Sequence, residues 1–554
     1  MRNTKTDQKF KQNMRSFINI SMLVLMLLIV LSACKKNFEE INTNPQGFTT
    51  ASNGSLFNAI IESLILTGNE QFYINNEILY KQTQLAALTR DAWGNFTLGT
   101  ESMWGNYYQS LPNFRELERR FNNMDQTPEV INMKAMLKIV LAYKTFKLTD
   151  IFGDMPFTYA GYGFQDLEYL HPPFDTQKSI YLFLLEELEW CDENIDVDAT
   201  TEEPFVSFSA FDRLFNADML KWQKFGNSLR LRYALRMSEK EPELGGEIIR
   251  QIVEDDRPLL LGYDFITFLG ESACIWPASM GFKNESLNWS FREHENLRMG
   301  SNIWHQLSAH DSTDGSGIFD PRAYIFFETN NENEWVPYPQ LPEPGTPTSG
   351  GIPYDSHRDQ AGAYQIKGET NIYSIFNYFI VRDEDFMPIP LITGAEVHYI
   401  LAEAYFRGIG LPQSLSQADI EYMNGINTSI DFWMQVAENS RLPLSGLSFT
   451  EMINIPPGLG SNSVLNVFGS WNAATDEEKL RFIYAQRWLD HFRQPWEAYA
   501  LARRTNMTPR EGETINHFRM PYPPSEAEYN SANWSEAIAL QGGDEPENKL
   551  WWIP

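Results

Sequence analysis

Apolar residues recur at spacings of three and four over much of the chain, which is the period of amphipathic helices. The pattern predicts helices over 56–66, 74–88, 103–121, 130–148, 219–238 and 393–407. Residues 130–148 are apolar on nearly every side, which is typical of a fully buried helix. In 219–238, Arg230, Arg232 and Arg236 lie off the apolar stripe, so we expect them on a face that is solvated or paired with carboxylates.

Local residue pairs mark further helix features near the C-terminus. Thr475 and Glu478 have the spacing of a capping box, which predicts a helix beginning there. Pro495 should break or kink that helix, because proline lacks the backbone N–H that a helix interior needs. Glu403 and Arg407 are four residues apart and can form an ion pair on one helix face.

The helical period is lost from about residue 256 to residue 390. Six prolines and three glycines lie between Trp335 and Tyr354 alone. A long irregular insertion in a compact protein is usually functional or disordered. We therefore expect residues 256–390 to be loop-rich and partly β.

The N-terminal residues have the pattern of a secretory signal. A basic segment precedes an apolar run from Met22 to Leu31, which is too short to span a bilayer. Small residues then lead to Cys34, as in a bacterial lipobox, where the cysteine thiol receives lipid. We expect a signal peptide over 1–33, lipidation at Cys34 and a tether over 34–50, with Met14 as an alternative start; an ordinary signal with a chance cysteine is the other interpretation.

The chain is strongly acidic. Its 554 residues carry a formal charge of −29, and −33 falls on residues 34–554, because residues 1–33 hold five Lys or Arg and one Asp. Such acidity argues against nucleic acid or an anionic membrane surface as a partner. No second long apolar run follows the leader, so the mature protein is expected to be tethered rather than membrane-spanning.

Two further cysteines, Cys191 and Cys274, follow Cys34. They could pair in an oxidising compartment, or both could be buried free thiols. Neither has a spacing to histidine or cysteine that indicates a metal site.

Catalytic motifs are missing from the sequence. The eight histidines form no His-Glu-x-x-His pattern, and no Gly-x-Ser-x-Gly elbow or glycine-rich phosphate loop is present. Two carboxylates for glycoside hydrolysis need not be close in sequence, so a hydrolase stays an open alternative. We expect no catalytic residue and no cofactor.

One acidic cluster could bind a cation. Asp311, Asp314 and Asp320 lie on a glycine-rich stretch, and oxygen ligands on a flexible loop suit Ca²⁺. The spacing does not match an EF-hand, and a solvated turn is the alternative interpretation.

Tryptophans in loops are the candidate ligand contacts among the 15 of the chain, because a flat aromatic face suits the apolar face of a sugar ring. Trp93 and Asn95 lie in an expected loop between helices, and Trp289 and Trp335 lie in the loop-rich half. Trp104, Trp222 and Trp488 fall on helical stripes and are expected in the core.

Several short motifs, in order along the chain, resemble the SusD/RagB family of outer-membrane nutrient-binding lipoproteins, in its SusD-like branch. They are Asn42-Thr43-Asn44-Pro45 after the lipobox, Phe152-Gly153-Asp154-Met155-Pro156, the Trp222–Arg232 helix, Asp320-Pro321-Arg322, Pro390–Val397, Ala500–Thr505, Arg519–Pro523 and Glu526–Asn530. Together they run over nearly the whole chain.

The resemblance implies a mainly α fold, in which four tetratricopeptide-like helix pairs form a superhelical scaffold beneath a loop-rich, ligand-facing half. It implies one domain over 51–554, with the scaffold at about 51–255 and 391–541 and the insertion at about 256–390. It also implies a surface-exposed lipoprotein of the outer membrane. Such a protein captures oligosaccharide or peptide and delivers it to a SusC-type TonB-dependent barrel. A surface glycoside hydrolase and a structural or adhesin-like protein are the alternatives.

Overall fold

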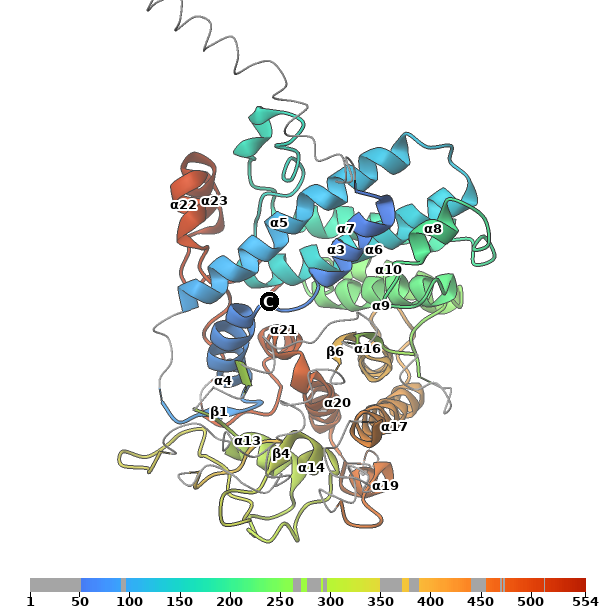
Figure 1. The fold of residues 1–554 in the computed structure, drawn as a ribbon. Coiled ribbons are helices and arrows are strands. Elements are labelled where there is room, and N and C mark those ends of the chain that lie inside the picture. Colours follow the sequence, from blue (N-terminus) through green and yellow to red (C-terminus); the bar gives the residue numbers. More distant parts are fainter. Residues whose placement is uncertain are drawn as a thin grey trace, which may run out of the picture. The chain divides into compact units, whose positions relative to one another are not determined.

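Helices make up most of the computed structural model, as the apolar period predicted (Figure 1). The structure describes residues 51–90, 96–262, 271–276, 290–291, 296–348, 371–377, 388–439, 455–468, 471, 474–512 and 514–554. Cys34 and the expected signal and tether lie outside these residues. The elements of the first half are α3 (Asn53–Glu62), the π-helix η1 (Glu70–Leu79), α4 (Tyr80–Thr83), β1 (Ala87–Leu88), α5 (Phe96–Asn122), α6 (Pro128–Phe152), η3 (Leu167–Leu170), α7 (Gln177–Asn194), α8 (Phe205–Ser209), α9 (Met219–Met237) and α10 (Pro242–Glu254).

The second half begins with short elements and returns to long helices. Its elements are β2 (Ala273–Ile275), β3 (Leu297–Arg298), α13 (Ser301–Leu307), α14 (Arg322–Phe326), β4 (Phe327–Glu328), β5 (Ile375–Phe376), β6 (Ile389–Ile392), α16 (Gly394–Arg407), α17 (Leu415–Asn439), α19 (Ser461–Phe468), α20 (Asp476–Asp490), η6 (His491–Arg493), α21 (Pro495–Thr505), α22 (Pro524–Tyr529) and α23 (Ser531–Gln541).

Successive helices pack against one another in pairs, α6 on α7, α9 on α10, α16 on α17 and α20 on α21. Helix α9 also packs against α7 and α16, and so joins the N-terminal helices to the C-terminal ones. Figure 1 shows α5, α6, α7 and α9 gathered in the blue and green part of the ribbon. The expected mainly α, superhelical scaffold is confirmed.

Helix α6 is buried on nearly every side, as its all-round apolar sequence predicted. It ends at Phe152, and Gly153 follows with φ +91°, a backbone conformation that side chains with a Cβ rarely adopt. The Gly153 N–H donates to the Thr149 carbonyl at 2.8 Å. The Phe-Gly-Asp-x-Pro motif is therefore a helix stop.

Helix α9 also differs from a simple amphipathic helix. Its apolar stripe is buried, but Arg230, Arg232 and Arg236 are buried as well, at 3%, 1% and 5% exposure. Each forms an ion pair, with Glu189, Glu396 and Asp150 among the partners. Of the two expected alternatives for this face, pairing with carboxylates is confirmed and solvation is wrong.

Caps place the C-terminal helices where the sequence predicted them. Thr475 Oγ1 accepts from the Glu478 N–H at 3.3 Å, and the Glu478 side chain accepts from the Thr475 N–H at 2.7 Å, which completes the capping box. Pro495 stands at the first turn of α21, after the break at η6. Glu403 and Arg407 form the expected ion pair at 3.0 Å.

The insertion between α10 and α16 is loop-rich in its described parts. Three two-stranded antiparallel sheets, β1–β3, β2–β6 and β4–β5, carry its strands, with Ala87 opposite Arg298, Ile275 opposite Ile389 and Phe327 opposite Phe376. The expected helix over 74–88 ends earlier, at Thr83. Gln84 there takes the left-handed conformation with φ +58°, and β1 follows.

One continuous apolar core joins the scaffold and the insertion, and residues Asn53–Pro554 form a compact unit. Cys191 and Cys274 are both buried free thiols, so they do not pair with each other. Burial raises the pKa of the Cys191 thiol to about 12. Within the part of the chain described, no helix is both long and apolar enough to cross a membrane.

Candidate ligand-binding site

The expected ligand contacts Trp93, Asn95 and Trp289 lie outside the described residues, and so does the lipidation site Cys34. Trp335 is described, and it is only 6% exposed. Its ring stacks on Trp304 with the centroids 5.8 Å apart, and the edge of Tyr324 meets it at 5.3 Å. Trp335 is therefore part of the core and offers no open face, contrary to the expectation of a ligand contact.

The three aspartates of the expected calcium loop have separate roles. Asp320 is fully buried and forms a bidentate ion pair with Arg322. Asp311 accepts from the Trp304 indole N–H at 3.0 Å, and Asp314 accepts from the Ser316 N–H at 2.9 Å. Among the described residues, no group of three or more acidic, histidine or cysteine side chains could hold a metal ion. The structure thus does not gather these carboxylates, and the solvated-turn alternative fits Asp314.

A polar groove runs between α3 and the first half of α5, with a volume of about 360 Å³. Its α5 wall carries side chains at positions 102, 106, 109 and 113, which share one face of a helix. The uncharged polar residues that line the groove include Ser63, Thr67, Ser102, Asn106, Gln109 and Asn113. Thr67 and Ser102 hydrogen-bond to each other, and Ser63 and Asn106 bond to neighbouring groups. The amides of Gln109 and Asn113, which both donate and accept hydrogen bonds, are therefore the groups that can match the hydroxyls of a sugar.

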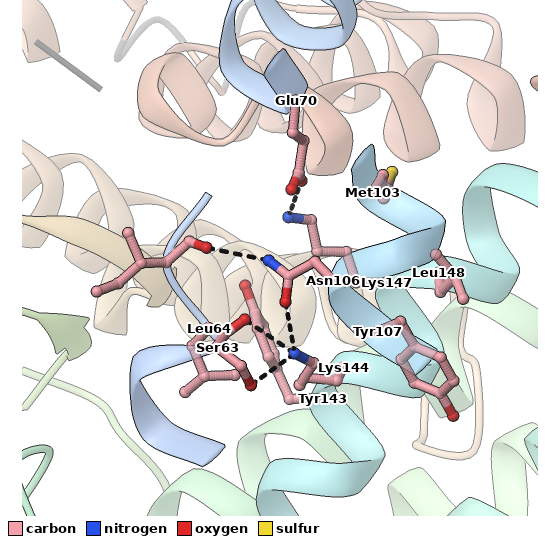
Figure 2. Close-up of a pocket in the computed structure, with 11 residues that line it drawn as sticks. Ser63, Leu64, Glu70, Met103, Asn106, Tyr107, Tyr143, Lys144, Lys147 and Leu148 are labelled. Carbon is pink, nitrogen blue, oxygen red and sulfur yellow. Dashed lines mark hydrogen bonds and ion pairs between the residues drawn. The ribbon is translucent and has the colours of Figure 1, made fainter. Parts of the chain in front are cut away.

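A small cavity of about 40 Å³ adjoins the groove and shares Ser63 and Asn106 with it. Figure 2 shows the Lys144 amine at its centre, pointing toward Ser63 and Asn106. The amine donates to the Ser63 carbonyl at 2.8 Å, to Ser63 Oγ at 2.7 Å and to Asn106 Oδ1 at 3.2 Å. Beside it, Lys147 donates to Glu70 at 2.6 Å. The cavity is large enough for water and too small for a sugar ring.

Burial and the nearby charge of Lys147 lower the pKa of Lys144 to about 7, against an opposing effect of Glu70. Three acceptors occupy the three N–H donors of the protonated amine. Lys144 therefore ties the end of α3 to α5 and α6, and positions the Ser63 and Asn106 side chains that also face the groove.

The groove has little capacity for acid–base chemistry. Among its described lining residues, Glu101 is the single carboxylate. Both of its oxygens accept hydrogen bonds from Ser525, at 2.8 Å from the backbone N–H and 2.6 Å from the hydroxyl. Glycoside hydrolysis ordinarily needs two carboxylates flanking the bond that is cleaved. The arrangement in the groove suits binding rather than cleavage.

A family model described as "Starch-binding associating with outer membrane", the SusD-like model, matches residues 45–523. The chain belongs to the SusD-like family. The expectation drawn from the short motifs is confirmed over most of the chain. Comparison with curated proteins gave no match.

Solved structures share the SusD-like fold. A chitin-binding protein is 21% identical with a TM-score of 0.65, over 91% of this chain and 100% of its own. A SusD homolog from Parabacteroides distasonis is 19% identical with a TM-score of 0.64, over 91% and 98%. A chitin-binding SusD homolog from Flavobacterium johnsoniae is 18% identical with a TM-score of 0.62, over 90% and 98%. At these identities the likeness shows the fold.

The polar groove of this SusD-like chain was not predicted from its sequence. A signal for it was present in the sequence, because Ser102, Asn106, Gln109 and Asn113 recur at helical spacing on one face of α5. Polar residues on a helix face normally indicate plain solvent exposure. Only the position of α3 beside α5 turns this polar face into the wall of a groove.

Proposed function

We propose that this protein is a lipid-anchored, surface-exposed glycan-binding protein of the outer membrane that captures oligosaccharide and delivers it to a SusC-type TonB-dependent transporter. The observation that carries the proposal is the family model, which covers residues 45–523 and is described as starch-binding and associating with the outer membrane. Two of the similar structures are named as chitin-binding. A glycan is accordingly the first ligand class to test, and peptide the second.

The lipid anchor rests on the sequence before Cys34. A chain held beside its transporter by lipid has a high effective concentration there, so modest ligand affinity is enough for delivery. Trp93, Asn95 and Trp289 stay the proposed loop contacts, and the groove along α5 adds a polar surface that suits sugar hydroxyls.

Titration calorimetry with malto-oligosaccharides, chitin oligosaccharides and short peptides tests the binding role. Each sample should be chromatographed afterwards. Saturable heat with intact ligand supports capture. Cleaved oligosaccharide would favour the alternative of a surface glycoside hydrolase.

Variants test which surface of the protein binds the ligand. Trp93→Ala tests the loop, and the double change Gln109→Ala with Asn113→Ala tests the groove, with the exposed Tyr529→Ser as a control for general effects. The delivery role needs a separate experiment, in which the tagged protein is purified from native outer membranes. Co-purification of a large barrel protein supports delivery, and its absence would refute that part of the proposal.

A further inference from the structure

Helices α5, α6 and α7 form a trough that shares no lining residue with the groove between α3 and α5. Helix α6 packs against both α5 and α7, and it forms the floor between them. Each helix lines the trough with one face, at residues 115, 118 and 122 of α5, 134, 138 and 141 of α6, and 183, 187 and 190 of α7. These spacings of three, four and seven residues keep the side chains of each helix on one side. The hollow they enclose has a volume of about 240 Å³.

One wall of the trough presents aromatic rings to solvent. Phe183 is 45% exposed, and Trp190, two turns later on α7, is half-buried. The Lys138 amine lies 5.1 Å from the centroid of the Trp190 ring. Aromatic rings offer flat apolar faces, and tryptophan adds an N–H that can donate a hydrogen bond. Their flat apolar faces suit the C–H face of a pyranose ring.

The lining of the whole trough carries more cations than acids. Lys138 forms an ion pair with Glu187. Arg115 is held by the carbonyls of Ala160 and Phe157, at 3.1 and 2.7 Å, and its guanidinium lies 3.6 Å from Glu118. Both acids are thus already engaged.

Lys134 is the cation of the lining that has no ion pair among the described residues. It donates to the neutral amide oxygen of Gln126, and among the described residues no carboxylate lies within ion-pairing distance of it. Burial lowers the pKa of Lys134, against an opposing effect of the nearby Glu118. Three cations and two carboxylates line the trough, in a chain whose formal charge is −29. An anionic group on the ligand would supply the missing partner.

We propose that the trough between α5, α6 and α7 binds one pyranose ring that carries a carboxylate, a uronic acid unit of a glycan. The ring would lie on Trp190 and Phe183, with its carboxylate at Lys134. The volume is below the roughly 300–1,000 Å³ of pockets that enclose drug-sized ligands, which fits one ring rather than a longer chain. The inference rests on the proposed glycan-binding role, and adds to it a second contact site and a ligand class.

A matched pair of probes tests the trough. A short oligogalacturonide and the same oligomer with its carboxylates methyl-esterified differ only in charge. Calorimetry on the purified protein should show the free acid binding several-fold more tightly than the ester. The preference should weaken as salt is raised, because the screening length falls to about 3 Å at 1 M ionic strength.

Two variants measure separately what the Trp190 ring and the Lys134 charge contribute to binding. Trp190→Ala should weaken binding of the acid roughly tenfold, since a buried aromatic anchor carries much of a binding energy. Lys134→Gln should leave ester binding in place and reduce the preference for the acid by up to about fivefold. Lys134 is partly exposed, so this change keeps the test valid even where Trp190→Ala impairs folding. Tyr529→Ser and Lys240→Gln, both exposed positions outside the trough, are the matched controls.

Equal affinity for acid and ester, no saturable binding of either, or an unchanged preference in Lys134→Gln would each overturn the trough proposal. Trp93→Ala distinguishes it from the loop contacts, because that change should leave the preference for the acid intact. The trough proposal and the proposed function can be refuted independently of each other. Binding of neutral malto- or chitin oligosaccharides and association with a barrel can persist when the oligogalacturonide does not bind.

Discussion

Arg232 on α9 and Glu396 on α16 form a fully buried ion pair, in which Arg232 Nε donates to Glu396 Oε1 at 2.9 Å. Arg487 donates to the same oxygen at 2.8 Å, and His491 Nε2 lies 3.3 Å from the other. The Leu391 carbonyl accepts from Arg232 Nη2 at 2.9 Å. Three cationic or ionisable side chains therefore surround one carboxylate where the N-terminal and C-terminal helices of the scaffold meet.

Glu396→Gln should strongly destabilise the protein. Removing one partner of a buried pair leaves an uncompensated buried charge, which costs about 3–5 kcal/mol of the free energy of unfolding. Denaturant unfolding followed by circular dichroism measures the loss. Glu247→Gln breaks an ion pair with Arg250 on the exposed face of α10, and should change stability little. Similar effects of the two changes would refute the role given to the buried pair.

Acid should remove a second buried contribution at Glu403. Arg504 and Arg407 donate to this carboxylate at 2.5–3.0 Å, and the Tyr484 hydroxyl donates at 2.9 Å. Burial alone raises the pKa of Glu403, but the arginines outweigh it and lower the pKa to about 2. A carboxylate with a depressed pKa stabilises the fold fully above its ordinary value of about 4.5, and this stabilisation is lost as the pH falls toward 2.

The comparison of wild type with Glu403→Gln isolates that contribution. The stability advantage of wild type should be constant at neutral pH and should shrink between pH 4.5 and about 2. Urea unfolding across that range measures it. An advantage that stays the same down to the lower limit would contradict the assigned pKa shift.

The helices could be predicted from the sequence where the determinant is local. The capping box at Thr475, the stop at Gly153 and the all-round burial of α6 follow from residues within one or two turns. The ion pairs of the arginines on α9 could not be predicted from the sequence in this way. Arg232 and Glu396 are 164 residues apart, so solvation and pairing look alike along the chain.

The candidate ligand contacts also depend on long-range packing, which the local sequence does not reveal. A loop-rich sequence around Trp335 favoured exposure, but Trp304 from α13 stacks on the ring and covers it. Conversely, Lys134, Glu187 and Trp190 each lie on an ordinary helical stripe. Only the packing of α5 and α7 on α6 brings such stripes together as a trough.

Gly153→Ala should destabilise the end of α6 by roughly 1–3 kcal/mol, the cost of holding a residue with a Cβ in a conformation that only glycine adopts readily. The added Cβ would also approach Gln541 Oε1 to 2.5 Å. Gly105 lies inside α5, where a Cβ meets nothing closer than 3.6 Å. Gly105→Ala should therefore stabilise by about 0.5–1 kcal/mol, through higher helix propensity. Thermal unfolding of the two variants should give shifts of opposite sign.

Lys144 should make stability depend on pH in the neutral to alkaline range. Burial disfavours the charged amine and lowers the pKa of Lys144 to about 7 in the folded protein, from the ordinary lysine value of 10.5. Between these values the unfolded chain binds more protons than the folded one, so the free energy of unfolding rises with pH. The slope can reach about 1.4 kcal/mol per pH unit for one group.

Lys144→Met removes this titration, while it leaves the acceptors on Ser63 and Asn106 without their donor. The loss of those hydrogen bonds does not vary with pH. Any pH dependence in the difference in free energy of unfolding between wild type and variant therefore comes from the titration of Lys144. Wild type should gain stability relative to Lys144→Met as the pH rises from about 7 toward 10.5, and the difference should be flat below about 7. Lys240→Met, at an exposed position, is the control. A difference that falls with rising pH would mean that the folded protein holds the Lys144 proton more tightly than the unfolded chain does. The three hydrogen bonds to the amine would then outweigh its burial.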